Sequence, residues 1–93
     1  MITYIHIGNK TTVNEKDIIA IIDIDKTTVS KITRDFLAVS QKKGLVINVS
    51  EDLPKSVVIC KTGKETRIYI SQISPVTLQG RYGKKVSKYE VNL

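Results

Sequence analysis

The stretch Ser56–Ile70 has the sequence SVVICKTGKETRIYI. It begins with a run of β-branched residues, passes through Thr62–Glu65 (TGKE), and ends in a second β-rich run at Arg67–Ile70. Valine, isoleucine and tyrosine fit a pleated, half-buried surface, and glycine allows a tight turn. The pattern therefore predicts a β-hairpin.

Three shorter β-rich runs lie outside this hairpin. Tyr4–Gly8 (YIHIG) is followed by a turn at 8–10, and Thr11–Val13 can return beside it as a second hairpin. Leu45–Val49 (LVINV) precedes a turn at Glu51–Pro54 that leads into Ser56. These runs predict further strands of a small sheet.

The segment Asp17–Ile24 (DIIAIIDI) is the most apolar part of the chain. Periodicity alone does not distinguish a buried strand from a helix here. Isoleucine is stiff at its branched Cβ and fits a pleated sheet better than a helix. We therefore predict a strand that is buried on both faces.

The hydrophobic period becomes helical from about Thr28. Apolar residues recur with the spacing of one helix face, at Val29, Ile32, Phe36 and Leu37. Thr27 or Thr28 can cap the first turn, Lys42 and Lys43 suit the negative end of the helix dipole, and Gly44 can close the helix. Phe36 is the only phenylalanine, so we predict that it anchors the core and that its truncation to alanine costs roughly 3–5 kcal/mol.

A second, short helix is predicted near the C-terminus. Ser74 is a good N-cap, Pro75 suits the first helical position, and the helix continues to about Arg81. We expect residues 1–81 to form one domain and residues 82–93 to form a basic tail, either an edge strand or mobile. The predicted fold class is α+β: a small, mostly antiparallel sheet with one main helix and one short C-terminal helix.

Length and composition limit the kind of protein. The chain has 93 residues, of which 41% are hydrophobic and 26% charged, as in a single folded domain. Its core is thin at this size, so self-association would help its stability. No run approaches the roughly 18 apolar residues of a membrane span, and the N-terminus lacks the features of a secretory signal. We therefore expect a cytoplasmic protein that does not enter membranes.

The residues that usually carry catalysis are sparse. His6 is the only histidine and lies between two isoleucines, which favours a structural role. Cys60, the only cysteine, ends a valine–isoleucine run and is expected to be buried and inert; the neighbouring Lys61 should point to the opposite face. The acidic residues do not repeat at a metal-loop spacing, and the glycines form no phosphate-binding loop. We therefore predict no enzyme activity, no cofactor and no metal site.

Positive charge is concentrated in the second half of the chain. The net charge is +6, and residues 53–93 hold eight basic groups against two acidic ones, whereas residues 1–52 balance at seven of each. Such segregation favours an anionic partner, above all double-stranded DNA. The candidate phosphate contacts are Lys55, Lys61, Lys64, Arg67, Arg81, Lys84, Lys85 and Lys88.

Short pieces in a fixed order also resemble a known family. The chain is similar to the extracellular-matrix regulators RemA and RemB, and closer to the RemB branch, over roughly residues 4–81. The matching pieces are Tyr4–Gly8, Asp17–Ile18 with Ala20–Ile21, Phe36–Leu37, Pro54–Val58, Ile68–Tyr69 with Ser71, Thr77–Leu78 and Arg81. The resemblance implies a compact subunit that forms homo-oligomeric rings and regulates biofilm genes; in the RemA branch a basic surface binds promoter DNA.

One loop departs from the RemA pattern. RemA-like proteins carry a Gly-Arg-Arg-Thr-Arg stretch before the strand that begins here near Ser56, whereas this chain has Asp52–Lys55 (DLPK). An arginine fork that can grip phosphate is lost there, and a lysine does not replace it. Two interpretations therefore stand: a ring-forming regulator that contacts the DNA backbone, and an oligomeric scaffold that works beside a sister regulator protein.

Overall fold

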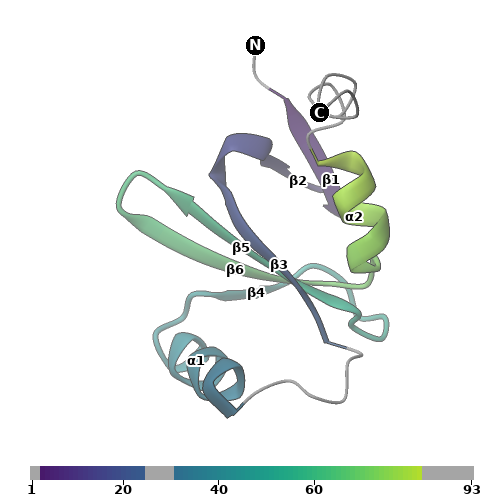
Figure 1. The fold of residues 1–93 in the computed structure, drawn as a ribbon. Helices are drawn as coiled ribbons and strands as arrows, with labels where there is room; N and C mark the ends of the chain where they lie inside the picture. Colours follow the sequence, from purple (N-terminus) through teal and green to yellow (C-terminus); the bar gives the residue numbers. More distant parts are fainter. Residues whose placement is uncertain (1–2, 25–30, 83–93) are drawn as a thin grey trace, which may run out of the picture.

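The computed structural model describes residues 3–24 and 31–82, and within them the side chains of residues 31–33 are left aside. This part of the chain contains six strands, a 3-10 turn and two α-helices (Figure 1). In chain order these are β1 (Tyr4–Gly8), β2 (Thr11–Asn14), η1 (Glu15–Asp17), β3 (Ile18–Asp23), α1 (Lys31–Lys42), β4 (Val46–Asn48), β5 (Ser56–Thr62), β6 (Glu65–Ser71) and α2 (Pro75–Arg81). The α+β class predicted from the sequence is confirmed.

Strands β5 and β6 form the hairpin that the sequence predicted. They pair antiparallel from Ser56–Ser71 to Thr62–Glu65, and Gly63 takes the positive φ of 61° that the two-residue turn requires. The sheet order is β3-β5-β6-β4, so the hairpin lies at its centre. Strand β4 runs parallel to β6, and the other pairs are antiparallel.

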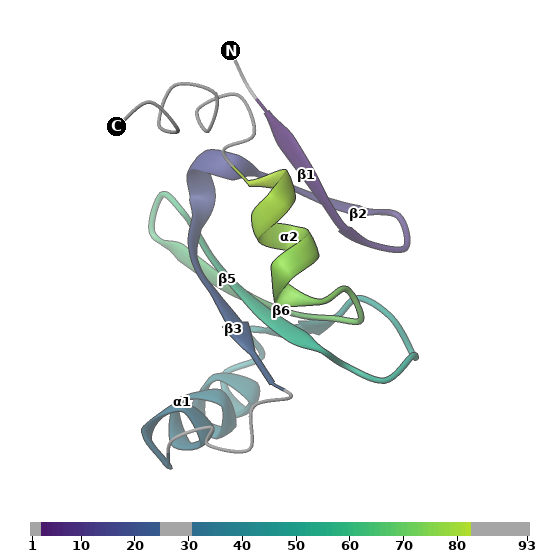
Figure 2. The same ribbon diagram turned by 45° about the vertical axis from the view of Figure 1, so that its right-hand side comes forward.

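A second sheet holds only β1 and β2. These strands pair antiparallel with a register shift between His6 and Gly8. Together with α2 they lie on one side of the four-stranded sheet, and α1 lies on the other side (Figures 1 and 2). We call these two sides the hairpin face and the α1 face of the sheet. The predicted single sheet is therefore divided into two.

The main core fills the space between the hairpin face and the elements above it. Its buried members come from β1, β2, β5, α2 and the end of β4: Ile5, Ile7, Val13, Val49, Val58, Cys60 and Leu78. Tyr69 packs against this cluster. Polar bonds join the layers, since the Ser71 hydroxyl donates to the Ile7 carbonyl at 2.6 Å and the Ser56 hydroxyl donates to the Ile73 carbonyl at 2.8 Å.

Gly8 ends β1 where the two sheets approach closely. Its φ is +136°, a conformation that L side chains rarely adopt. A Cβ at this position would lie 2.5 Å from Gln72 Oε1 and 2.8 Å from a Val49 methyl carbon. The absence of a side chain therefore allows β1 to pack against the sheet.

Helix α2 begins as predicted. The Ser74 hydroxyl accepts a hydrogen bond from the Thr77 amide at 3.2 Å, and Pro75 occupies the first turn. Leu78 is fully buried against the hairpin face, whereas Val76 remains 78% exposed. Of the predicted tail, residues 82–93, only Tyr82 is described; residues 83–93 lie outside the described residues, and so does the predicted N-cap of α1 at Thr27 or Thr28.

Strand β3 forms where the sequence predicted it, but its predicted burial on both faces is wrong. Among the described residues, β3 has a strand neighbour on one side only, β5. Its residues are half-buried, and Ile19, at an irregularity in the pairing, is 61% exposed. The isoleucine run therefore forms an edge strand rather than a central one.

The prediction that Phe36 anchors the core is also wrong, because its side chain is 42% exposed. Helix α1 instead turns Leu37 and Ser40 inward, three residues apart on one face, and Ser40 is only 3% exposed. Phe36 lies one position, about 100°, away from Leu37 on the helix. Val39 is exposed as well, at 51%.

Neither helix is suited to crossing a membrane: within residues 3–24 and 31–82 no helix is both long and apolar enough to do so.

Candidate nucleic-acid interface

Three of the predicted DNA contacts lie at one end of the β5–β6 hairpin. Lys61 is near the end of β5, Lys64 is in the turn, and Arg67 follows in β6; all three are exposed. The tight turn at Gly63 brings these side chains to the same end of the sheet. This end is therefore the part of the structure that gathers the predicted site residues.

The three cations do not share one face of the hairpin. Lys61 is paired with Thr66, whereas Arg67 is paired with Cys60, whose side chain belongs to the core on the hairpin face. Paired residues project to the same face and successive residues alternate. Arg67 therefore projects to the hairpin face and Lys61 to the α1 face, while Lys64 lies in the turn between them.

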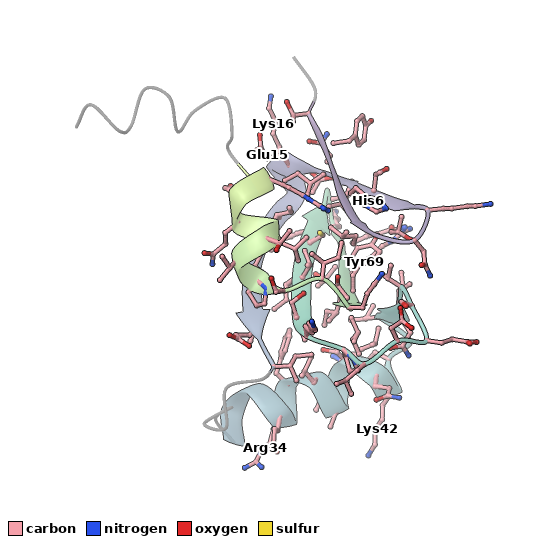
Figure 3. The ribbon with its side chains drawn as sticks, turned by 90° about the vertical axis from the view of Figure 1, so that its right-hand side faces the viewer. His6, Glu15, Lys16, Arg34, Lys42 and Tyr69 are labelled. Carbon is pink, nitrogen blue, oxygen red and sulfur yellow. The ribbon has the colours of Figure 1, made fainter. Side chains whose placement is uncertain are left out.

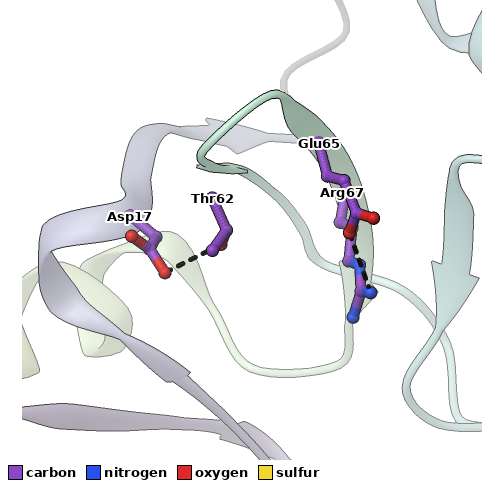
Figure 4. Close-up of polar contacts among 4 residues, drawn as sticks. All are labelled: Asp17, Thr62, Glu65 and Arg67. Carbon is purple, nitrogen blue, oxygen red and sulfur yellow. Dashed lines mark hydrogen bonds and ion pairs between the residues drawn. The ribbon is translucent and has the colours of Figure 1, made fainter.

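Acidic side chains accompany the cations at this end (Figure 4). Asp17 accepts a hydrogen bond from the Thr62 hydroxyl at 2.8 Å, which holds a carboxylate beside the end of β5. Arg67 forms an ion pair with Glu65 at 3.2 Å, with both side chains well exposed. A hydrogen bond with the Tyr69 side chain, and after it the charge of Glu65, raises the pKa of the Arg67 guanidinium. The Arg67 head group is therefore charged and is paired within the subunit.

A hollow of about 600 Å³ opens beside Lys64 and Arg67. Its walls come from the segment that joins α1 to β4 and from the start of β6: Gly44, Leu45, Ile47, Lys64, Glu65, Thr66 and Arg67. Strand β4 pairs only with Ile68–Ile70, so β6 extends beyond it. The hollow lies in the step that this difference in length leaves at the edge of the sheet.

Arg81 lies elsewhere and already has a partner. It ends α2, and its Nη1 donates a hydrogen bond to the His6 carbonyl at 2.7 Å. This bond joins the end of α2 to β1 across the hairpin face. Arg81 is therefore separated from the hairpin end and has a structural contact within the subunit.

Lys55 lies at the opposite end of β5. Its amide donates to the Ser71 carbonyl at 2.8 Å and its carbonyl accepts from the Ile24 amide at 3.1 Å, so its backbone is fixed while its side chain is exposed. Glu51 and Asp52, four and three residues before it, make this loop acidic. The remaining predicted contacts, Lys84, Lys85 and Lys88, lie outside the described residues.

One cation near the hollow was missed by the sequence reasoning. Lys43 directly precedes Gly44, a wall of the hollow, and its amide still donates to the Val39 carbonyl at the end of α1. The sequence indicated only its favourable position at the helix end. Its proximity to the Lys64–Arg67 segment depends on the parallel pairing of β4 with β6, which no local pattern signals.

The groups that could support catalysis are in structural positions. Cys60 is buried as predicted, and burial, with a smaller effect of Asp17, raises the pKa of its thiol from 9.0 to about 11. The His6 ring lies against the carbonyl of Asn9 through Nε2 in the β1–β2 turn (Figure 3). In the part of the chain that is described, no three His, Cys, Asp or Glu side chains gather as metal ligands.

These features define a small α+β domain with three exposed cations at one end of its larger sheet and a buried thiol. Over residues 4–82 the chain matches the model of a family described as RemA-like, extracellular matrix regulatory protein A-like. It therefore belongs to the RemA-like family, a regulatory family whose members are associated with the extracellular matrix and biofilm formation. The match does not distinguish the RemB branch. Among curated proteins, no sequence matches the chain.

Proposed function

We propose that this protein is a non-enzymatic, cytoplasmic regulator of matrix genes that forms a closed homo-oligomer and contacts the backbone of duplex DNA. The observation that carries the proposal is the meeting of Lys61, Lys64 and Arg67 at one end of the β5–β6 hairpin. Exposed cations of this kind can neutralise phosphates and release counterions. Membership of the RemA-like family supports a regulatory role.

The contact would be governed by the DNA backbone rather than by base sequence. Lys61 and Lys64 are point charges, and the Arg67 fork is partly occupied by Glu65. Phosphate contacts position a protein on the duplex but carry little sequence information. A ring would add the contacts of several subunits on one duplex.

Self-association is supported by apolar side chains exposed around the β3 edge. Ile19, Val76 and Tyr82 are 61%, 78% and 44% exposed. Ile19 and Tyr82 also line a hollow of about 330 Å³ with the neighbouring β3 residues and Gln79. An edge strand flanked by apolar side chains is a site at which another chain can pair.

A second candidate function is an oligomeric scaffold that binds a sister regulator protein without DNA. The acidic loop at Glu51–Asp52 favours it, since relatives of the RemA type are positive at this place. The pairing of Arg67 with Glu65 and of Arg81 with His6 also reduces the number of cations available to phosphate.

A gel-shift titration with duplex DNA over a series of salt concentrations tests the first function. We expect log K to fall with log salt at a slope of roughly −2 to −4 per contacting subunit. The triple charge reversal of Lys61, Lys64 and Arg67 to glutamate should weaken binding to all sequences alike. Absence of binding by the wild-type protein at low salt would favour the scaffold.

Light scattering on the same samples tests the assembly. A closed oligomer gives one molar mass over a wide concentration range because its contacts are all satisfied. A stable monomer at micromolar concentration would contradict this part of the proposal.

A further inference from the structure

We infer that the DNA backbone lies in the hollow between Gly44–Ile47 and Lys64–Arg67, with Lys43 as a third phosphate contact. The inference rests on the proposed function and assigns its contact to one side of the hairpin end. It adds Lys43 to the interface, from the first half of the chain, in which basic and acidic groups are equal in number. It also predicts that Lys61, on the other face, contributes less.

The wall at Gly44–Leu45 is held in place by backbone hydrogen bonds. Gly44 takes a φ of 73°, and the Leu45 amide donates to the Ser40 carbonyl at 3.0 Å, which closes α1. The Leu45 carbonyl in turn accepts from the Ile68 amide of β6 at 2.9 Å. The end of α1 is thus joined directly to the strand that carries Arg67.

The opposite wall presents charges toward an open edge. Lys64 and Arg67 both line the hollow, and Glu65 is the one acidic residue among its lining side chains. The planar guanidinium of Arg67 suits a phosphate, although Glu65 already occupies part of it. Because β6 extends beyond β4 here, a duplex can approach without meeting another strand of the described sheet.

Helix geometry distinguishes Lys43 from Lys42. Lys43 is exposed and lies three positions after the buried Ser40, about 60° from it around the helix. Lys42 is two positions after Ser40, about 200° around the helix, and it points away from the sheet (Figure 3). Lys43 therefore lies beside the hollow, and the adjacent Lys42 does not.

Lys61 has a less favourable environment for phosphate. It projects to the α1 face, away from Arg67, and it is not among the residues that line the hollow. The hollow is lined by Lys64, Arg67 and one carboxylate, Glu65, and Lys43 directly precedes its Gly44 wall.

Single charge reversals separate these positions. Lys43→Glu and Lys64→Glu should each weaken binding to duplex DNA by about tenfold or more at low salt and make the salt slope about one unit shallower. Lys42→Glu is the matched control, with the same charge change one residue away, and should weaken binding less than about threefold. The loss of DNA affinity in Lys61→Glu should lie between that of Lys42→Glu and those of Lys43→Glu and Lys64→Glu.

The outcomes distinguish this inference from the proposed function. If wild-type protein fails to bind DNA, the proposed function fails first. If the wild-type protein binds, two results would contradict the inference: Lys42→Glu losing as much DNA affinity as Lys43→Glu, or Lys61→Glu losing as much as Lys64→Glu. In either case the DNA backbone does not lie in the hollow. Binding of polyglutamate to the wild-type protein, lost in Lys43→Glu while DNA binding persists, would assign the hollow to acidic protein segments and overturn the inference.

Discussion

The two faces of the four-stranded sheet are covered in different ways. On the hairpin face, the β1–β2 hairpin and α2 bury Ile7 and Leu78 completely. On the α1 face, the strand residues Val57 and Ile68 are buried just as fully, but the helix above them leaves Phe36 42% exposed. The sheet itself is therefore well packed on both faces, and the covering layer differs.

Polar contacts between the layers follow the same division. The cover of the hairpin face is joined to distant parts of the chain by Asn9 Nδ2 to the Val49 carbonyl at 2.7 Å, by Ser71 to Ile7, and by Arg81 to His6. Helix α1 is closed by the bond from the Leu45 amide to the Ser40 carbonyl, five residues apart. We therefore expect the stability of the domain to depend mainly on the hairpin face.

The largest expected effect is the loss of Leu78 from the hairpin face. Leu78→Ala should lower the free energy of unfolding by about 3–4 kcal/mol, because it removes buried methyl groups and leaves a cavity beside α2 in the main core. Urea denaturation measures the change. Val76→Ala, on the exposed side of the same short helix, is the control and should cost less than about 0.5 kcal/mol. Equal losses would show that α2 does not pack as described.

A smaller effect is expected on the α1 face. Phe36→Ala should cost about 1 kcal/mol, since much of the ring is already in water and alanine favours the helix. The same urea measurement tests it. A loss of 3–5 kcal/mol would mean that Phe36 is a core residue after all, and the contrast between the two faces would disappear.

The smallest expected effect concerns the reactivity of the single thiol. Cys60 in the native protein should react slowly with a bulky thiol reagent at pH 8, because burial raises its pKa to about 11. In a Cys60→Ala background, Val39→Cys on exposed α1 should react rapidly. Rapid labelling of native Cys60 would contradict the described packing.

The same thiol gives the protein a pH dependence with a definite sign. The folded pKa of Cys60 lies above its ordinary value of 9.0, so the folded state keeps the proton that the unfolded state releases. This contribution is fully present below pH 9 and is lost as the pH rises from 9 through about 11. Replacing Cys60 by alanine should remove this alkaline component from a urea-denaturation series.

Local patterns predicted most of the elements. Alternating β-branched residues and a glycine turn gave the β5–β6 hairpin, and Ser74 with Pro75 gave the start of α2, because hairpins and caps depend on residues close in sequence. The role of Phe36 was not predictable in this way. Hydrophobic spacing shows that a helix has an apolar face, but the partner elements decide which part of that face is covered.

The residues of the candidate site likewise fall into those that the sequence indicated and those that only the structure brought to light. The charge difference between the halves of the chain pointed to Lys61, Lys64 and Arg67, and the tight turn brings them to one end. Strand alternation then separates Lys61 from Arg67. Lys43 could not be assigned to this end from sequence, because 20 residues divide it from Lys64.

By itself, the sequence determined the α+β class, the β5–β6 hairpin, the burial of Cys60 and the half of the chain that holds the positive charge. Each follows from residue type or from neighbours within a few positions. Only the tertiary structure decided that the isoleucine-rich β3 is an edge strand and that β4 runs parallel to β6, which opens the hollow beside Arg67. Strand order and direction depend on contacts between segments far apart in the chain, and local propensity does not predict such contacts.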